Sequence, residues 1–282
     1  MECLSFKRLK APCHWLRYHL LLYCVASLRS PHRPWLYSRK PESIRKLMSG
    51  FVPWKEYLGV GLFRHGSGAY AYTTDETALD ADGSLFAYHP DNIGRDDLRF
   101  ASWPSGDEDW RSILVSDPDD PTRPFMQNDG PAKGFFLSMT TLRCSFGSPT
   151  DPLTYVNSET IPYIVFPVDF LKIQGVGGFG DLGMARNLSN GRSSWAIVAD
   201  QGPAGHPLGE ISLQLAENLG GVRVNPRNGD GIAPGPVEYM VFPNSRLSPP
   251  WPQSADALEA TASRHFSTVG GWGTRISNGS NL

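Results

Sequence analysis

Two carboxylic acids stand ten residues apart in the segment 195–212, where an apolar run ends in Asp200 and a loop rich in glycine and proline leads to Glu210. A buried strand would deliver Asp200 at its end, and Gly209 would allow close backbone approach before Glu210. Cleavage of a glycosidic bond needs two such groups, because one protonates the leaving oxygen and the other supplies the base or nucleophile. The spacing also permits a structural role, in which Asp200 caps a turn and Glu210 favours the N-terminus of the next helix.

A glycine-rich run, 175–180, fits the pattern GxGxxG, and Asp200 lies twenty residues beyond its last glycine. A dinucleotide-binding motif requires a strand before these glycines and an amphipathic helix that begins within them. The residues that follow have no helical apolar stripe and close with Asn190-Gly191, which is typical of a type I′ hairpin turn. The run is therefore predicted to be a tight loop and not a nucleotide site.

The stretch Asp80-Ala81-Asp82-Gly83 resembles the start of a calcium-binding loop. The third acidic ligand and the closing glutamate of such a loop are missing, so a turn rich in Asp and Gly is expected. The seven histidines show no metal-ligand spacing, and no GxSxG sequence is present. We expect neither a metal nor a cofactor.

Charge is distributed unevenly although the formal net charge is only −2. Residues 1–56 contain eleven Lys or Arg against three acidic residues, and residues 75–129 contain fourteen Asp or Glu against four arginines. The small net charge gives no reason to expect a nucleic acid as partner. The acidic segment would attract a cationic ligand, and its alternative interpretation is a solvated acidic face.

Turns and short strands dominate the pattern, since the chain has 29 glycines and 24 prolines. Apolar runs of strand length lie at 68–73, 134–140, 163–166, 195–199 and 238–242. Two short helices are predicted, one over 213–219 with Ser212 as its cap and one over about 255–266 with Ser254 as its cap. We expect a mainly β domain over 57–273, a basic extension or linker over 1–56, and a flexible tail over 274–282.

No apolar run approaches the ~18–20 residues that a membrane span needs. The run Leu20–Ala26 follows basic residues as a secretory signal does, but it is short. The alternative is an upstream extension of the reading frame with the start near Met48. Three of the four cysteines lie in this part of the chain, and with Cys144 they imply no disulfide framework.

The segment 198–220 resembles the signature of the fungal-type chitosanases of glycoside hydrolase family 75, in which an aspartate ends a strand and a Gly-Glu-x-Ser turn follows. Ile211 stands where that family usually has a small residue. The likeness covers about 61–273 and includes further stretches in the same order. These are 79–83, 87–90, 128–142, 180–183, 241–243 and 270–271.

The resemblance implies an inverting hydrolase of chitosan, a polymer of β-1,4-linked glucosamine, with Glu210 as general acid and Asp200 as general base. The expected substrate-binding residues are Asp80, Asp82, Tyr88, His89, Asp129, Thr140 and Asp181. Tyr88, Trp103, Trp110 and Phe135 are candidates for stacking on sugars, with core packing as the alternative. The expected protein is a monomer whose partner is the polysaccharide, and secretion is expected from its function although the N-terminal signal is weak.

The same segment is also similar to the double-psi β-barrel proteins, in which a strand ends in Asp-Arg-Gly-Pro. This likeness implies a compact double-psi-like β-barrel with short helices and long loops. It also supplies two alternatives to a chitosanase. One is a peptidoglycan lytic transglycosylase, and the other is a non-catalytic, expansin-like polysaccharide-binding protein, which does not need Glu210.

Overall fold

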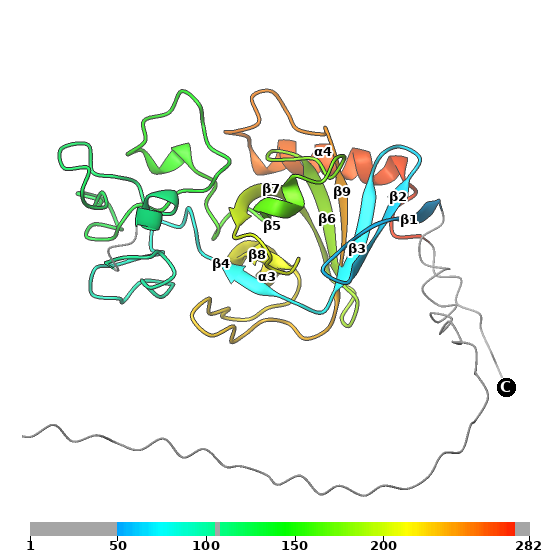
Figure 1. Cartoon of the computed structure of the whole chain (residues 1–282), viewed down its shortest axis with the longest axis horizontal. Helices are drawn as coiled ribbons and strands as arrows, with labels where there is room; N and C mark the ends of the chain where they lie inside the picture. The colour runs from blue at the N-terminus through cyan, green and yellow to red at the C-terminus, as the bar shows by residue number, and fades with distance from the viewer. Residues whose placement is uncertain (1–49, 105–107, 274–282) are drawn as a thin grey trace, which may run out of the picture. The chain divides into compact units, whose positions relative to one another are not determined.

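The computed structural model describes residues 50–104 and 108–273, which form a mainly β fold around one nine-stranded mixed sheet (Figure 1). The predicted fold class is confirmed, and the strand arrangement is consistent with a β-barrel-like fold. The order across the sheet is β1-β2-β3-β9-β6-β7-β5-β8-β4. The strands are β1 (Phe51–Tyr57), β2 (Val60–His65), β3 (Tyr70–Thr74), β4 (Ala78–Asp80), β5 (Tyr163–Pro167), β6 (Leu182–Asn187), β7 (Ser193–Gly202), β8 (Glu210–Ser212) and β9 (Val237–Phe242).

Three α-helices lie in the described residues, and two of them begin at a serine cap. They are α2 (Val168–Leu171), α3 (Leu213–Asn218) and α4 (Ala255–Thr268), with 3₁₀ turns at Glu108–Ser112 and Pro152–Thr154. The Ser212 hydroxyl accepts from the amide of Leu215, and the Ser254 hydroxyl accepts from that of Ala257, as predicted for both caps. Within residues 50–104 and 108–273, no helix has the length and apolar character to cross a membrane.

Four of the five predicted strand runs form strands, and the fifth does not. The run 134–140 makes only isolated bridges, such as that between Tyr88 and Phe136, because its neighbours are irregular loops. The predicted hairpin between β6 and β7 is present, but the prediction that a two-residue type I′ turn joins them is wrong. Only Gly191 has a positive φ, and the side chain of Asn187 accepts from the amides of Ser189 and Asn190 within a longer loop.

The folded region begins earlier than residue 57. Residues 51–56 belong to β1, which pairs antiparallel with β2 and ends at the buried Tyr57. This edge strand carries Pro53 and follows a basic stretch, which is why the sequence predicts a linker up to residue 56, and several of its side chains are partly or fully exposed. Residues 1–49 lie outside the described part of the chain, as do the predicted signal, the start near Met48 and the tail 274–282.

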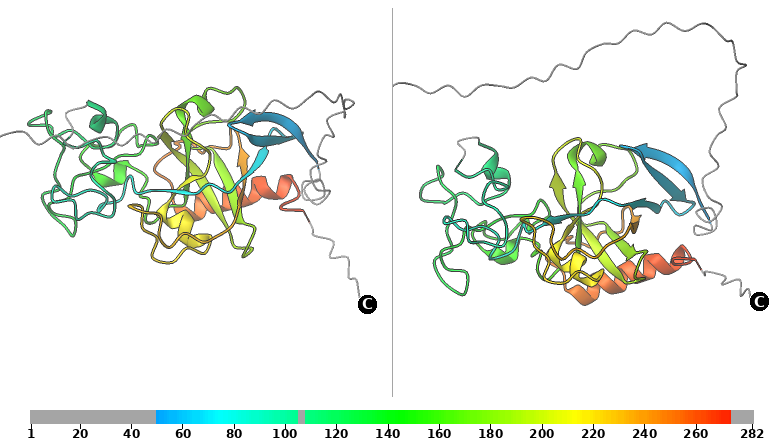
Figure 2. Two further views of the ribbon diagram at one scale, coloured as in Figure 1. Left: turned by 60° about the horizontal axis from the view of Figure 1, so that its bottom comes forward. Right: turned by 90° about the horizontal axis from the view of Figure 1, so that it is seen from below.

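The sheet separates two apolar clusters, one on each face. The first contains Ile164, Phe166 and Val198, together with the stacked rings of Tyr72 and Tyr239. The second contains Tyr163, Val165 and Ala199, and α4 covers part of it through Leu258 and Ala262 (Figure 2). The cluster to which a residue of β5 or β7 belongs therefore shows the face of the sheet to which its side chain points.

Candidate active site

Asp200 lies inside β7 and not at its end, since the strand continues to Gly202. β5 runs parallel to β7, with Ile164 opposite Val198 but Val165 opposite Asp200. One extra residue, Ala199, therefore sits on β7 at this point. Regular alternation would place Asp200 on the face of Val198, and the irregularity places it on the face of Val165 instead. The sequence prediction missed this shift because no residue type marks it.

Glu210 begins β8, on the other side of β5. Its neighbour Ile211 pairs with Ile164 and belongs to the first apolar cluster, so Glu210 points to the opposite face, that of Val165. A Cβ atom added at Gly202 would lie 3.0 Å from Oε2 of Glu210. The Glu210 carboxyl group therefore lies against β7 two residues beyond Asp200, a span of roughly 6.6 Å of strand.

Gly209 fixes the entry to β8. Its φ is +130°, and a Cβ atom there would collide with the backbone carbonyl oxygen of Glu76. Close approach of these two segments allows β4 to pair in parallel with β8, with Ala78 opposite Glu210 and Asp80 opposite Ser212. Asp80 is thereby placed one strand away from Glu210 and on the same face of the sheet.

Asp80, Asp82 and Asp200 form a carboxylate cluster, with one oxygen of each within 4.8 Å of the others. The predicted turn is present, and the amide of Asp82 donates to Oδ1 of Asp80 over 2.8 Å. Oδ1 of Asp82 is buried without a hydrogen-bond partner. In the part of the chain that the structure describes, no Lys or Arg forms an ion pair with these three groups or with Glu210.

Burial governs the protonation of this site. It raises the pKa of Glu210 to about 8, and the nearby charges of Asp80 and Asp96 add to the effect. Burial also raises the pKa of Asp200, but only to about 6, because hydrogen bonds from Thr141 and from the amide of Gln201 oppose it. Near neutral pH, Asp200 is therefore ionised while Glu210 carries a proton.

The remaining carboxyl groups of the site hold protons more strongly than usual. Burial and the charge of Asp200 raise the pKa of Asp80 to about 8, and burial and Asp80 raise that of Asp82 well above its usual range. A cation bound by Asp80, Asp82 and Asp200 would have to displace these protons.

Two buried tyrosines lie beside these carboxyl groups. Tyr163 donates to the carbonyl oxygen of Asp82 over 3.0 Å, and the hydroxyl of the buried Tyr88 lies 3.5 Å from Asp96.

The residue that holds Asp200 is Thr141, which was not among the predicted site residues. The Thr141 amide and hydroxyl donate to Oδ1 of Asp200 over 3.0 and 2.7 Å. The predicted Thr140 is instead fully buried, where its hydroxyl donates to Leu142 and accepts from Val156. Two adjacent threonines give no sign of which one faces the acid, because that depends on how this loop crosses β7.

Three other predicted binding residues lie outside the carboxylate cluster. Asp181 is buried and accepts from the amides of Gly178 and Arg246, which closes the glycine-rich loop ahead of β6 and confirms that this run is a loop. His89 accepts from the amide of Asp91 and packs edge-on against Phe135. Asp129 is exposed in a turn. The structure therefore brings Asp80, Asp82, Asp200 and Glu210 together, and leaves these three elsewhere.

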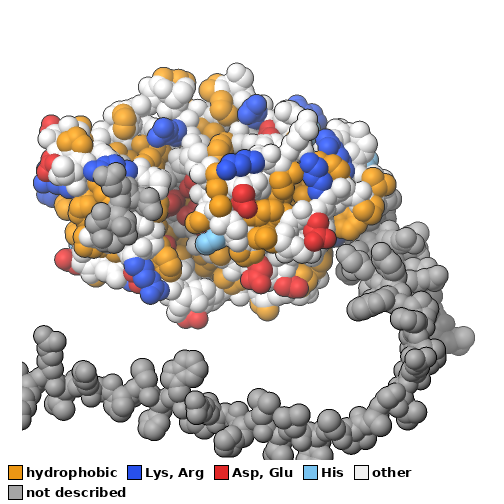
Figure 3. Space-filling view, in the orientation of Figure 1, with side chains coloured by type: hydrophobic (Ala, Val, Ile, Leu, Met, Phe, Trp, Pro, Cys, Tyr) orange, Lys and Arg blue, Asp and Glu red, His pale blue; other side chains and the backbone are white. Residues whose placement is uncertain are grey.

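The acidic segment 75–129 divides into two classes of residue. Asp80, Asp82 and Asp96 belong to the site, whereas Asp97, Asp117 and Asp120 pair with neighbouring arginines at the surface. Figure 3 shows acidic side chains in a hollow between the long-loop segment that follows β4 and the sheet.

The four aromatic candidates for sugar stacking differ in burial. Tyr88 and Trp110 are buried in the core, whereas Trp103 and Phe135 are partly exposed.

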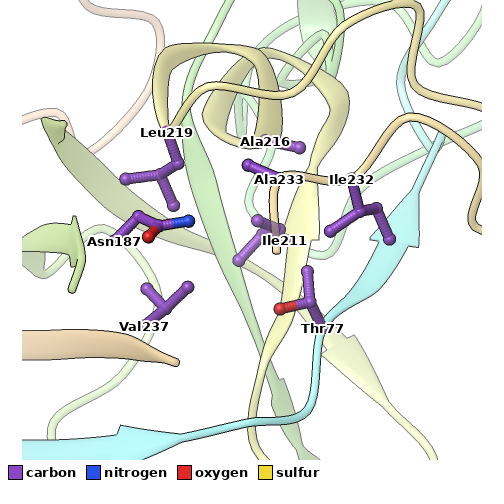
Figure 4. A pocket seen from close by; sticks show the side chains of 8 residues that line it. All are labelled: Thr77, Asn187, Ile211, Ala216, Leu219, Ile232, Ala233 and Val237. Atoms are coloured by element: carbon purple, nitrogen blue, oxygen red, sulfur yellow. The ribbon is translucent and has the colours of Figure 1, made fainter. Parts of the chain in front are cut away.

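A separate small pocket lies between β8, α3 and the loop before β9 (Figure 4). Its lining is mostly apolar and includes Ile211, Leu219, Ile232 and Val237. Its volume of about 10 Å³ is no more than one water molecule requires, so it is too small for a sugar.

Asp200 and Glu210 place one ionised and one protonated carboxyl group on one face of the sheet. Such a pair can accept one proton and donate another, as general acid–base catalysis requires. No protein-family model matches the chain, and no curated protein matches it either.

Proposed function

We propose that the protein is a chitosanase that hydrolyses internal β-1,4 linkages between glucosamine residues with inversion, as the motifs shared with glycoside hydrolase family 75 suggest. The observation that supports this best is the pair itself. Asp200 and Glu210 face the same side of the sheet, and their raised pKa values of about 6 and about 8 lie on either side of neutrality.

In this proposal, Glu210 donates its proton to the glycosidic oxygen as the bond to the anomeric carbon breaks. Asp200 takes a proton from a water molecule, whose oxygen forms the new bond on the opposite face of the sugar. Asp200 ends protonated and Glu210 ionised, and exchange with solvent restores both. The hydrogen bonds from Thr141 support the ionised form of Asp200 that this step requires.

The charge of the site favours a cationic sugar. Five buried or partly buried carboxyl groups lie together, namely Asp80, Asp82, Asp96, Asp200 and Glu210. Among residues 50–104 and 108–273, only Asp96 of these five has a nearby cation, Arg227. Glucosamine is cationic near its amine pKa, and its ammonium group would offset the cost of ionising these acids. Peptidoglycan is already anionic and fits this environment less well. We propose a secreted monomer that acts on the polymer directly.

The test is an assay of new reducing ends after incubation with chitosan, chitin, carboxymethyl cellulose and peptidoglycan, with Glu210→Gln as the matched control. We expect release from chitosan by the wild type alone, with the α-anomer as the first product in a proton NMR spectrum. Release of anhydro-sugars from peptidoglycan would support the transglycosylase instead. Binding of chitosan without any cleavage by folded wild type would support the polysaccharide-binding protein.

A further inference from the structure

The Glu210 carboxyl group receives no hydrogen bond from any residue that the structure describes. Its position is therefore set by the backbone, namely by the three-residue strand β8 and by the loop that precedes it. That loop, 203–209, begins with five exposed residues, 203–207, before the buried Leu208. An exposed segment of this kind has many accessible conformations unless something holds it.

Asp169 binds this loop through a hydrogen bond to its carboxylate. The amide of Gly205 lies 3.2 Å from both carboxylate oxygens of Asp169, which stands in the first turn of α2. Although burial opposes it, hydrogen bonds from Tyr57 and Gly205 lower the pKa of Asp169, so the acceptor is ionised at neutral pH. Hydrogen bonds to an ionised acceptor are stronger than those between neutral groups.

Tyr57 joins the first strand of the sheet to the same loop. Its hydroxyl lies 2.9 Å from Oδ1 of Asp169 and 3.1 Å from the carbonyl oxygen of His206, within donating distance of both. The ring is buried and packs edge-on against Phe170, with the ring centres 5.1 Å apart. The hydroxyl is thus fixed by its ring, and it contacts the loop four residues before Glu210.

We infer that Tyr57 and Asp169 are positioning residues for Glu210, because together they tether the loop 203–209, which joins β7 to β8 and leads directly into Glu210. This inference rests on the proposed function for its effect on turnover. Neither side chain touches the substrate in this assignment. Its consequence is that β1, at the edge of the sheet and far from Asp200 in sequence, is required for the acid to be in place.

The test compares Tyr57→Phe, Asp169→Ala and Asp169→Asn with the wild type. Tyr57→Phe keeps the packed ring and removes only the hydroxyl, and Asp169→Asn keeps an oxygen acceptor at the same place. Tyr155→Phe is the matched control, since Tyr155 is also buried and its hydroxyl donates to the carbonyl oxygen of Pro149 in another loop. Amide hydrogen exchange over 203–209, kcat and KM on chitosan, and melting temperature are measured for each protein.

We expect faster exchange over 203–209 in Tyr57→Phe and Asp169→Ala, with roughly a 10-fold lower kcat and a KM within about twofold. Asp169→Asn should recover part of the loss, and the double variant should lose less than the sum of the singles because the two groups act as a unit. A merely structural role would lower the melting temperature and leave kcat of the folded enzyme unchanged, which would overturn the inference.

Hydrogen exchange needs no substrate, so it separates the two proposals. A wild type without chitosanase activity would refute the proposed function, and faster exchange in the Tyr57 and Asp169 variants would still support the tether. Unchanged exchange over 203–209 in both variants would overturn the tether even if the enzyme is active.

Discussion

The two sides of the candidate site are held by different means. On the β7 side, Asp200 accepts three hydrogen bonds, two from Thr141 and one from the amide of Gln201. On the β8 side, the described residues give the Glu210 carboxyl group no hydrogen bond, and this group rests against Gly202. Both acids are largely buried, yet the pKa of Asp200 is raised only to about 6 and that of Glu210 to about 8.

The difference follows from what each group must do in the proposed reaction. A general base must be ionised, and donors that contact its carboxylate favour that form. A general acid must keep its proton, so donors near it would work against its role. Glu210 must therefore be placed by backbone and packing, through Gly209, Gly202 and the Tyr57–Asp169 tether, and not by hydrogen bonds to its carboxylate.

Removing either acid is the largest test of this comparison. Asp200→Asn and Glu210→Gln should each lower kcat on chitosan by roughly 10²–10⁴-fold, while chitosan binding stays close to that of the wild type. Turnover is measured by reducing ends, binding by titration calorimetry, and folding by circular dichroism. Hydrolysis at the wild-type rate in either folded variant would contradict the assignment of the pair.

Filling the space beside Glu210 tests whether packing alone places it. In Gly202→Ala, the new methyl group would lie 3.0 Å from Oε2 of Glu210, so the acid must move. We expect kcat to fall roughly 10- to 100-fold with little change in KM. Gly178→Ala is the control, because a Cβ atom there meets nothing within 4 Å. Equal kcat in the two variants would show that the position of Glu210 does not depend on Gly202.

The pH dependence of kcat/KM tests the two protonation states. Activity should be bell-shaped, because Asp200 must be ionised, above about pH 6, and Glu210 protonated, below about pH 8. In Thr141→Val the loss of one donor raises the pKa of Asp200, so the acid limb should move up by roughly one pH unit. The alkaline limb should stay, and Thr150→Val, in an exposed loop, should move neither. A shift of the alkaline limb alone would contradict this division.

The smallest expected effect is on stability. Folding raises the pKa of Asp80 to about 8 from an ordinary value near 3.8, so the folded state binds more protons between these pH values. Stability from this group is present at low pH and is lost as the pH rises through about 8. Asp80→Asn can keep the acceptor for the Asp82 amide and avoids that loss. Its melting temperature relative to wild type should therefore rise between pH 5 and pH 8.5.

The exposed Asp119 provides the comparison for this measurement. Asp119→Asn should show the same difference from the wild type at both pH values. If Asp80→Asn behaves in the same way, the Asp80 carboxyl group is not strained by burial in the folded protein.

The sequence alone predicted the mainly β fold and both capped helices, which the structure confirms. It also singled out Asp200 and Glu210, which the structure places on one face of the sheet. These depend on local information: strand-length apolar runs, the caps Ser212 and Ser254, and a Gly-Pro loop between Asp200 and Glu210. The glycine-rich run was also predicted correctly as a loop. The residues that follow it lack the periodic apolar pattern of the helix that a nucleotide site requires, and they form β6.

Only the tertiary structure decided which side chains meet. The extra residue at Ala199 turns Asp200 onto the face of Glu210, Thr141 reaches Asp200, and β1, most of which lies in the predicted linker 1–56, contributes Tyr57. Asp181, which the motif resemblance assigned to the substrate, accepts hydrogen bonds from the amides of Gly178 and Arg246 and closes a loop. Such outcomes depend on the register between strands that are distant in sequence, and a shift of one residue reverses the face to which a side chain points.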